Sequence, residues 1–213
     1  MWNILSTIGL KMNKIFNYLD ELFENPICEL EFNKDYELLI ATVLSAQTTD
    51  KRVNKVTRVL FKKYPSIEAL SNASVKDIES IIKEIGTYHK KAIFVKDIAT
   101  RLLNDNVTVL PNDRKYLESL PGVGRKTTNV FLSVIYNEPA IAVDTHVARV
   151  SKRLGLANEE DTVDIIEKKL MKKVPKERWG RTHHQLVLFG RYYCKAKNPE
   201  CVNCNLKDIC KKN

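Results

Sequence analysis

Apolar side chains recur along this chain at intervals of three and four residues, the spacing that places them on one face of an α-helix. Three segments show this spacing: Val53, Val56 and Leu60; Ile78, Ile81, Ile82 and Ile85; and Val163, Ile166, Leu170 and Val174. Only residues 106–111 (NVTVLP) alternate as a strand does, and that stretch is too short to found a sheet. The pattern therefore predicts an all-α fold built from many short helices.

Polar and glycine residues mark where several of these helices begin and end. Ser74, three residues before Asp77, resembles a capping box, and Asp161 can cap the helix that follows it. Gly86 and Gly155 stand where helices are expected to stop, because glycine readily adopts the left-handed conformation of a helix C-terminus.

The composition is that of an ordinary soluble globular protein with one domain or two small ones. The 213 residues are 44% hydrophobic and 29% charged, and only seven glycines and seven prolines argue against disorder and against a loop-rich all-β fold. The longest apolar stretch, residues 38–46, is far too short to cross a membrane. The opening residues also lack the basic region and the cleavage site of a secretory signal, and Met12 is an alternative start to Met1. We expect a cytoplasmic protein, associated with the nucleoid if it is bacterial.

Positive charge is concentrated in the second half of the chain. The formal net charge is +9, and residues 111–213 carry 20 Lys and Arg against 12 Asp and Glu, whereas residues 1–110 carry 15 against 14. A local basic excess favours a polyanionic partner such as nucleic acid. A generally lysine-rich composition would give the same total charge, so charge alone leaves both readings open.

The segment LPGVGRKTTNV (120–130) combines a glycine turn with the start of a helix. Gly122 and Gly124 permit tight backbone geometry, and an apolar face formed by Val130, Phe131, Val134 and Ile135 follows. A helix N-terminus after such a turn presents backbone N–H groups that can bind an anion such as a DNA phosphate. A plain corner between two helices is the alternative.

Four of the five cysteines fall close together, at Cys194, Cys201, Cys204 and Cys210. In a reducing compartment such a cluster indicates a metal site rather than disulfides. Four thiolates can hold one [4Fe–4S] cluster or one structural zinc ion. Zinc sites usually contain two close pairs of cysteines, and this chain has one C-x-x-C, which favours the cluster.

Together these motifs resemble the endonuclease III superfamily of DNA glycosylases. LPGVGRKT is similar to the family's helix-hairpin-helix, and Asp144 in AVDTHVARV (142–150) follows Lys126 by eighteen positions, as the family's acidic residue does. LSAQTTD (44–50) and the cysteine spacing are also similar to family motifs. The resemblance extends from about residue 14 to residue 210.

The resemblance implies an activity and a role for each motif. The chain would be a bifunctional DNA glycosylase and AP lyase that excises oxidised pyrimidines during base excision repair. Lys126 would attack the sugar C1′, form a Schiff base and allow β-elimination, with Asp144 assisting. A free lysine is protonated at neutral pH; the helix N-terminus, Arg125 and partial desolvation would favour the neutral amine. The cofactor would be a [4Fe–4S] cluster on the four clustered cysteines.

The partner implied is double-stranded DNA with damaged bases or abasic sites, bound by a monomer without a membrane. Gln47 would fill the hole left by the extruded nucleotide, although the same turn can simply cap a helix. The implied DNA contacts are Gln47, Gly122, Val123, Gly124, Arg125, Thr145, His146, Lys195 and Lys197. The implied fold has two lobes: residues 28–138 form a six-helix barrel with the helix-hairpin-helix, and residues 1–27 with 139–213 form an iron–sulfur cluster lobe.

One position departs from the family pattern. EIGTYHKKA (84–92) resembles the family segment GLYNSKA, but Thr87 stands where a leucine often wedges into the duplex. Threonine lacks the length and apolar bulk of a wedge. Tyr88 or His89 are the candidates to replace it.

Three other classes of protein remain to be distinguished. Mismatch adenine and thymine glycosylases of the superfamily generally lack the lysine, and the adenine enzymes usually carry an additional C-terminal domain. A non-catalytic DNA-binding or redox module would need neither Lys126 nor Asp144. A zinc-dependent DNA-binding protein would contain zinc instead of iron and sulfide.

Overall fold

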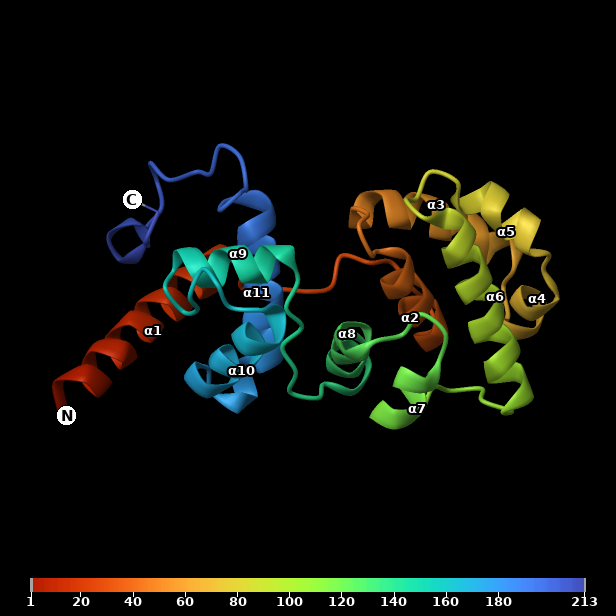
Figure 1. Ribbon diagram of the computed structural model, residues 1–213, viewed down its shortest axis with the longest axis horizontal. Coiled ribbons are helices and arrows are strands. Elements are labelled where there is room, and N and C mark those ends of the chain that lie inside the picture. The colour runs from red at the N-terminus through yellow and green to blue at the C-terminus, as the bar shows by residue number, and fades with distance from the viewer. Residues whose placement is uncertain (1, 213) are drawn as a thin grey trace. The chain divides into compact units, whose positions relative to one another are not determined.

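The fold is all-helical, as the apolar spacing predicts. The structure, a computed structural model, describes the backbone of residues 2–212 and the side chains of residues 9–212. Over residues 2–212 it contains eleven α-helices and two short 3₁₀ helices and no strand, so the alternating stretch 106–111 is a loop (Figure 1). No helix in this range is long and apolar enough to cross a membrane.

The chain divides into two compact units. The hairpin unit is residues 28–136, and the cysteine unit combines the segment before Cys28 with the chain from Asn137 onward. The hairpin unit contains α2 (Asp35–Leu44), α3 (Asp50–Lys63), α4 (Ile67–Asn72), α5 (Val75–Ile82), α6 (Tyr88–Asn104), α7 (Arg114–Ser119) and α8 (Arg125–Tyr136). The cysteine unit contains α1 (Trp2–Leu22), α9 (Thr145–Arg153), α10 (Val163–Lys173), η1 (Lys176–Arg178), α11 (Trp179–Tyr192) and η2 (Lys207–Ile209).

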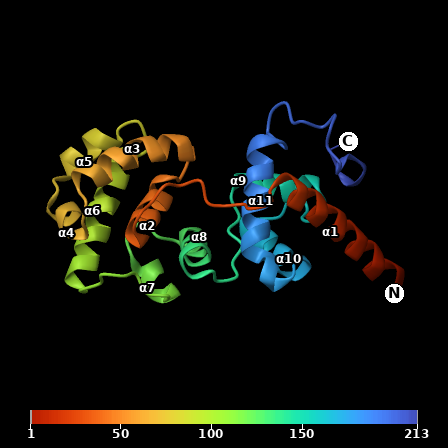
Figure 2. The same cartoon turned by 180° about the vertical axis from the view of Figure 1, so that it is seen from behind.

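Helix α2 is the centre of the hairpin unit. Its residues from Tyr36 to Leu44 are buried on every side, which is the pattern of a core helix rather than an amphipathic surface helix. It packs against α3, α6 and α8, and both views show it between α6 and α8 (Figures 1 and 2). The carboxylate of Glu37 satisfies the backbone N–H groups of Asn33 and Lys34 before the helix, at 2.7 and 3.3 Å.

Two of the predicted helix boundaries are confirmed. The Ser74 hydroxyl accepts a hydrogen bond from the Asp77 N–H at 3.1 Å and caps α5. Gly155 has a φ of +65°, and it follows α9 as a left-handed helix terminator.

The other two predictions are wrong. Thr162, not Asp161, is the N-cap of α10; the Asp161 carboxylate instead accepts hydrogen bonds from the Asn158 N–H and the Lys169 ammonium, at 2.7 and 2.6 Å. The charged lysine competes successfully for the carboxylate. The left-handed residue before α6 is Thr87, with a φ of +57°, rather than Gly86.

The carboxylate of Asp20 ties α1 to α11 in the cysteine unit. It accepts hydrogen bonds from Arg178, Arg181 and Gln185, at distances of 2.8 to 2.9 Å. Partial burial opposes ionisation of Asp20, but these three donors outweigh it and lower the pKa of the carboxyl group. The charged network therefore fixes α1 beside the helix that leads into the first clustered cysteine.

Candidate functional site

The glycine segment forms the turn of a helical hairpin between α7 and α8. The Leu120 carbonyl accepts a hydrogen bond from the Val123 N–H at 3.1 Å, with Pro121 and Gly122 between them. Gly122 has a φ of +75°, and proline followed by a left-handed glycine is the pattern of a type II turn. The predicted hairpin is thus present, and its geometry depends on this turn.

A side chain at Gly122 would strain the backbone and force its surroundings to shift. A Cβ atom there would lie 2.5 Å from the Phe94 ring of α6, far inside van der Waals contact. Gly124 differs, because a Cβ atom at that position meets nothing within 4 Å and its φ is not positive. The second glycine is therefore not required by the packing of the hairpin unit.

Helix α8 begins directly after the turn with its first residues outside the core. Its first hydrogen bond runs from the Thr128 N–H to the Gly124 carbonyl at 3.0 Å, so the N–H groups before Thr128 have no partner within the helix. Residues 128–133 are buried. Phe131 belongs to the core cluster, and Val134 and Ile135 pack against it. Val130 is also buried, so the predicted apolar face is confirmed.

Lys126, the second residue of α8, is exposed and has no hydrogen-bond or ion-pair partner within the described hairpin unit. The partial desolvation expected for its amine is not provided by this unit, because burial of α8 starts only at Thr128. Arg125 is likewise exposed. The hairpin unit by itself therefore leaves the Lys126 amine open to solvent.

Asp144 belongs to the cysteine unit, where it caps α9. Its Oδ1 accepts a hydrogen bond from the Val147 N–H at 2.8 Å, and the side chain is half-buried. The cap fixes the orientation of the carboxylate at the helix N-terminus, where a negative charge is favourable. Its capping role and a catalytic role are therefore compatible.

The predicted DNA contacts differ in how they are exposed. Gln47, Thr145 and Lys197 are exposed, whereas the Val123 side chain is only 6% exposed and packs in the core of the hairpin unit. Since the Val123 N–H is used in the turn, this residue shapes the hairpin rather than offering its side chain to a ligand. Gln47 has a φ of +58°, an uncommon conformation for a residue other than glycine.

Two further predicted contacts are engaged within the cysteine unit. The His146 ring lies 3.2 Å from the Arg149 guanidinium, measured from Nδ1 to Nη2. The Lys195 ammonium pairs with the Glu200 carboxylate at 2.8 Å. An exposed pair of this kind contributes little to stability, so Lys195 remains available to an anionic ligand.

In residues 84–92, the segment that departs from the family pattern, the Thr87 side chain is bound to the neighbouring backbone. The Thr87 hydroxyl donates to the Gly86 carbonyl at 2.6 Å, and His89 Nδ1 lies 2.8 Å from the Glu79 carboxylate. Tyr88 is partly buried against the core. Among the candidates to replace the wedge, His89 is the one whose ring is exposed.

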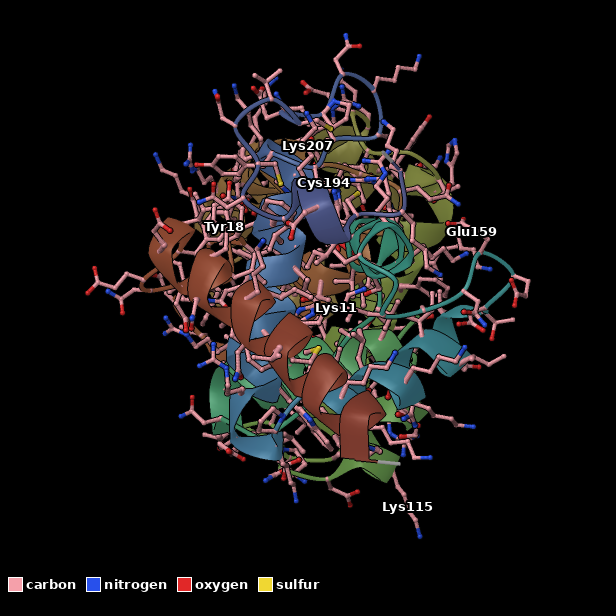
Figure 3. The ribbon with its side chains drawn as sticks, turned by 90° about the vertical axis from the view of Figure 1, so that its left-hand side faces the viewer. Lys11, Tyr18, Lys115, Glu159, Cys194 and Lys207 are labelled. Carbon is pink, nitrogen blue, oxygen red and sulfur yellow. The ribbon has the colours of Figure 1, made fainter. Side chains whose placement is uncertain are left out.

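All four clustered cysteines line one pocket of the cysteine unit. The pocket encloses about 450 Å³ including its open mouth. Figure 3 shows Tyr18, Cys194 and Lys207 on one side of this unit. The other lining residues are Arg153, Leu154, Phe189, Tyr193, Pro199, Glu200, Cys201, Cys204, Leu206, Cys210 and Lys212. The lining combines apolar side chains such as Leu154 and Phe189 with charged ones such as Arg153 and Lys212.

The electrostatics of the thiols show that they influence one another. Burial raises the pKa of Cys204, and negative charge on Cys194, Cys201 and Cys210 raises it further. No three His, Cys, Asp or Glu side chains in the described part of the chain converge where they could hold one ion. Four thiols that line one pocket are the type and number of donors that a [4Fe–4S] cluster or a structural zinc ion requires.

Two arginines of α9, which the sequence analysis missed, hold the loop at the first cysteine. Arg153 donates to the Cys194 sulfur at 3.3 Å and to the Lys195 carbonyl at 2.8 Å. Arg149 donates to the Cys194 carbonyl at 3.1 Å and the Gly190 carbonyl at 2.7 Å. The sequence offered one signal for these two arginines. They are four residues apart in the helix that follows Asp144, and this spacing places both side chains on one helix face.

Comparison with known proteins places these features in a family. A profile described as HhH-GPD superfamily base excision DNA repair protein matches residues 40–176. Endonuclease III of Bacillus subtilis (strain 168) is 47% identical over 193 residues, which cover 91% of this chain and 88% of the relative.

Two solved structures are similar over nearly the whole chain. A non-covalent endonuclease III–DNA complex has a TM-score of 0.91 and 44% identity, and it covers 95% of both chains. A trapped endonuclease III–DNA covalent intermediate, an estranged-adenine complex, has a TM-score of 0.88 and 47% identity, covering 94% of this chain and 95% of the other.

The all-helical fold with its glycine hairpin is thus that of a helix-hairpin-helix DNA glycosylase. Within this class, the chain belongs to the HhH-GPD superfamily of base excision DNA repair proteins and to its endonuclease III family. It is an enzyme, a DNA glycosylase and AP lyase of base excision repair.

The two glycines of the hairpin predict different mutational effects. Gly122→Ala should lower the free energy of unfolding by about 2–4 kcal/mol, because it combines backbone strain with a clash against Phe94. Gly124→Ala should change it by less than about 1 kcal/mol. Denaturant unfolding of both variants measures the difference, and equal effects would contradict the assigned turn geometry.

Proposed function

We propose that this enzyme removes oxidised pyrimidines from duplex DNA and then cleaves the strand, with Lys126 as the nucleophile. The supporting observation is the placement of Lys126 in the first turn of α8, exposed and without a partner within its unit, directly after the glycine turn. A lysine with a structural role in the fold would be expected to be engaged. One similar solved structure is a trapped covalent intermediate of endonuclease III with DNA, a species that an amine nucleophile can form.

The glycosylase step requires access to a bond that base stacking hides, so the damaged nucleotide must leave the duplex. The neutral Lys126 amine then attacks C1′, and a bond forms between Nζ and C1′ as the bond from C1′ to the base breaks. The electron pair of that bond leaves with the base, which takes up a proton, and the nitrogen loses one. Bound DNA would supply the desolvation that the hairpin unit itself does not.

The lyase step follows from the covalent adduct. Opening of the sugar ring converts the adduct into a Schiff base, which makes the hydrogen on C2′ acidic. Removal of that proton forms a C2′–C3′ double bond, and the C3′–O bond breaks with the 3′ phosphate as the leaving group. Water then hydrolyses the Schiff base and releases Lys126.

Asp144 is proposed to stabilise charge and to accept a proton in the glycosylase step. Its carboxylate would stabilise the positive charge that develops on the sugar and accept the proton that the attacking nitrogen loses. The capping hydrogen bond to Val147 occupies Oδ1 and fixes the carboxylate, which reduces its reorganisation during the reaction.

DNA binding is assigned to groups that the fold presents at helix ends and loops. The turn of Gly122 and Gly124 with Arg125 would hold a phosphate through the N-terminus of α8, which does not read sequence. Lys195 and Lys197 would contact phosphates from the loop between Cys194 and Cys201. Thr145 and His146, at the start of α9, would line the DNA beside Asp144, and Gln47 would fill the space of the extruded nucleotide.

The cysteines Cys194, Cys201, Cys204 and Cys210 are proposed to ligate a [4Fe–4S] cluster. When bound, the cluster would cross-link residues 194–210 into a fixed loop and supply no atom to the reaction. The supporting observations are the single pocket that all four cysteines line and the hydrogen bond from Arg153 to the Cys194 sulfur. Lys195 and Lys197 would be held in position by that loop.

The catalytic assignment predicts separate effects for two variants. Lys126→Ala should abolish the adduct that borohydride traps with duplex DNA containing an abasic site. Asp144→Asn should lower the single-turnover excision rate by about 10²–10⁴-fold, because a neutral amide neither takes the proton nor stabilises positive charge. Lys115→Ala is the matched control, since Lys115 is an exposed lysine of α7 in the same hairpin and extends outward (Figure 3). Trapping that survives in Lys126→Ala, or vanishes in Lys115→Ala, would reject the assignment.

The cofactor assignment predicts the metal content of the purified protein. It should contain about four iron atoms and matching labile sulfide per chain. Cys204→Ala should lose both, whereas Cys28→Ala should retain them, because Cys28 lies in the hairpin unit. Stoichiometric zinc in place of iron, or equal losses in the two variants, would disprove the cluster.

A further inference from the structure

A lysine of α6 that the proposed mechanism does not use is buried inside the hairpin unit. Lys91 is only 4% exposed. Its ammonium donates to the Leu44 carbonyl at 2.9 Å, to the Ala46 carbonyl at 2.6 Å and to the Thr48 hydroxyl at 3.4 Å. The three donors of an ammonium group thus meet three oxygens of one short segment.

These oxygens lie at the C-terminus of α2 and in the turn that follows. The last carbonyls of a helix have no partner within it, and the helix dipole favours a cation at that end. Burial lowers the pKa of Lys91, because a charged ammonium group is less stable away from water. The fold nevertheless buries this lysine. The carbonyls of Leu44 and Ala46 need a hydrogen-bond donor that the rest of α2 cannot provide, and the Lys91 ammonium is that donor.

The turn that Lys91 holds carries Gln47. Gln47 is exposed and has a φ of +58°, and the turn closes with a hydrogen bond from the Thr48 N–H to the Ser45 carbonyl at 3.0 Å. A glutamine in the left-handed region persists only where its surroundings impose that conformation. Lys91 binds the carbonyl immediately before Gln47 and the hydroxyl immediately after it, so it fixes both sides of this residue.

The same lysine also connects to the second unusual turn. The Lys91 backbone N–H donates to the Thr87 carbonyl at 3.1 Å, and Thr87 is an exposed left-handed residue with a φ of +57°. Helices α2 and α6 lie side by side in both views of the hairpin unit (Figures 1 and 2). One residue therefore links the Gln47 turn to the Thr87 turn, which stands where the family pattern has a wedge residue.

We propose that Lys91 is a positioning residue that holds the Gln47 turn in the conformation needed to enter the duplex. This inference rests on the proposed function, in which Gln47 fills the space of the extruded nucleotide. Lys91 acts only through the backbone of residues 44–48 and the start of α6, and it touches neither DNA nor the reacting atoms. Its importance is therefore confined to substrates in which a nucleotide must be displaced from a duplex.

The test uses Lys91→Met, which keeps the length of the side chain and removes its donors. In the full-length, cofactor-loaded enzyme, this variant should lower the single-turnover lyase rate on a duplex abasic site by about a hundredfold, the loss that a small misplacement causes. The rate on a single-stranded abasic-site oligonucleotide should stay within about twofold of the native rate, because no nucleotide is displaced from a partner strand.

Lys96→Met is the matched control. Lys96 also belongs to α6 and donates to a backbone carbonyl, that of Ala73 at 2.8 Å, but this carbonyl precedes α5 and not the Gln47 turn. Lys96→Met should therefore leave both rates unchanged. If Lys91→Met does not fold, as judged by circular dichroism, Lys91→Gln replaces it, and its smaller loss should again be confined to the duplex.

A double-mutant cycle with Gln47→Ala separates positioning from general stability. If Lys91 acts through Gln47, the two substitutions together should cost little more than either one alone on the duplex. Additive losses, equal losses on both substrates, or an unchanged duplex rate would overturn the role of Lys91. A native enzyme that forms no Schiff base on either substrate would reject the proposed function itself, and the role of Lys91 with it.

Discussion

The close approach of the Gly122 backbone to the Phe94 ring is the contact on which the proposed site depends. Because a Cβ atom would lie 2.5 Å from the ring, any residue other than glycine would force the turn or the Phe94 ring to shift. This turn determines where α8 starts. The first helical hydrogen bond is donated by Thr128, where burial of the helix also begins, so Lys126 lies outside the core. One steric constraint thus places the helix end that is proposed to bind phosphate and an exposed amine next to each other in the chain.

In the cysteine unit, α9 combines two functions within nine residues. Its N-cap is Asp144, and its last two turns carry Arg149 and Arg153, which hold the loop at Cys194. Burial lowers the pKa of Arg149, and the neighbouring positive charge of Arg153 lowers it further by a smaller amount. Hydrogen bonds from Arg149 to backbone carbonyls offset the cost of burying its charge. A short rigid helix therefore orients the proposed catalytic carboxylate and supports the proposed ligand loop.

Local sequence patterns predict the helices and the hairpin well, because apolar spacing and glycine turns act within a few residues. They fail where a distant partner competes. Asp161 looks like an N-cap, but the Lys169 ammonium takes its carboxylate, and the neighbouring Thr162 caps α10 instead. Lys91 occupies a position on the apolar face of α6 where a hydrophobic residue is expected, which was a usable signal. Its partners are carbonyls more than forty residues away in sequence, so no local pattern could identify them.

The claim that Lys126 forms the covalent bond to DNA is tested most directly by locating that bond. The enzyme is reacted with a duplex containing an abasic site, the Schiff base is reduced with borohydride, and the adduct is digested and mapped by mass spectrometry. We predict that the sugar remnant is attached to Nζ of Lys126. Attachment to the N-terminal amine or to any other lysine, with Lys126 unmodified, would contradict it.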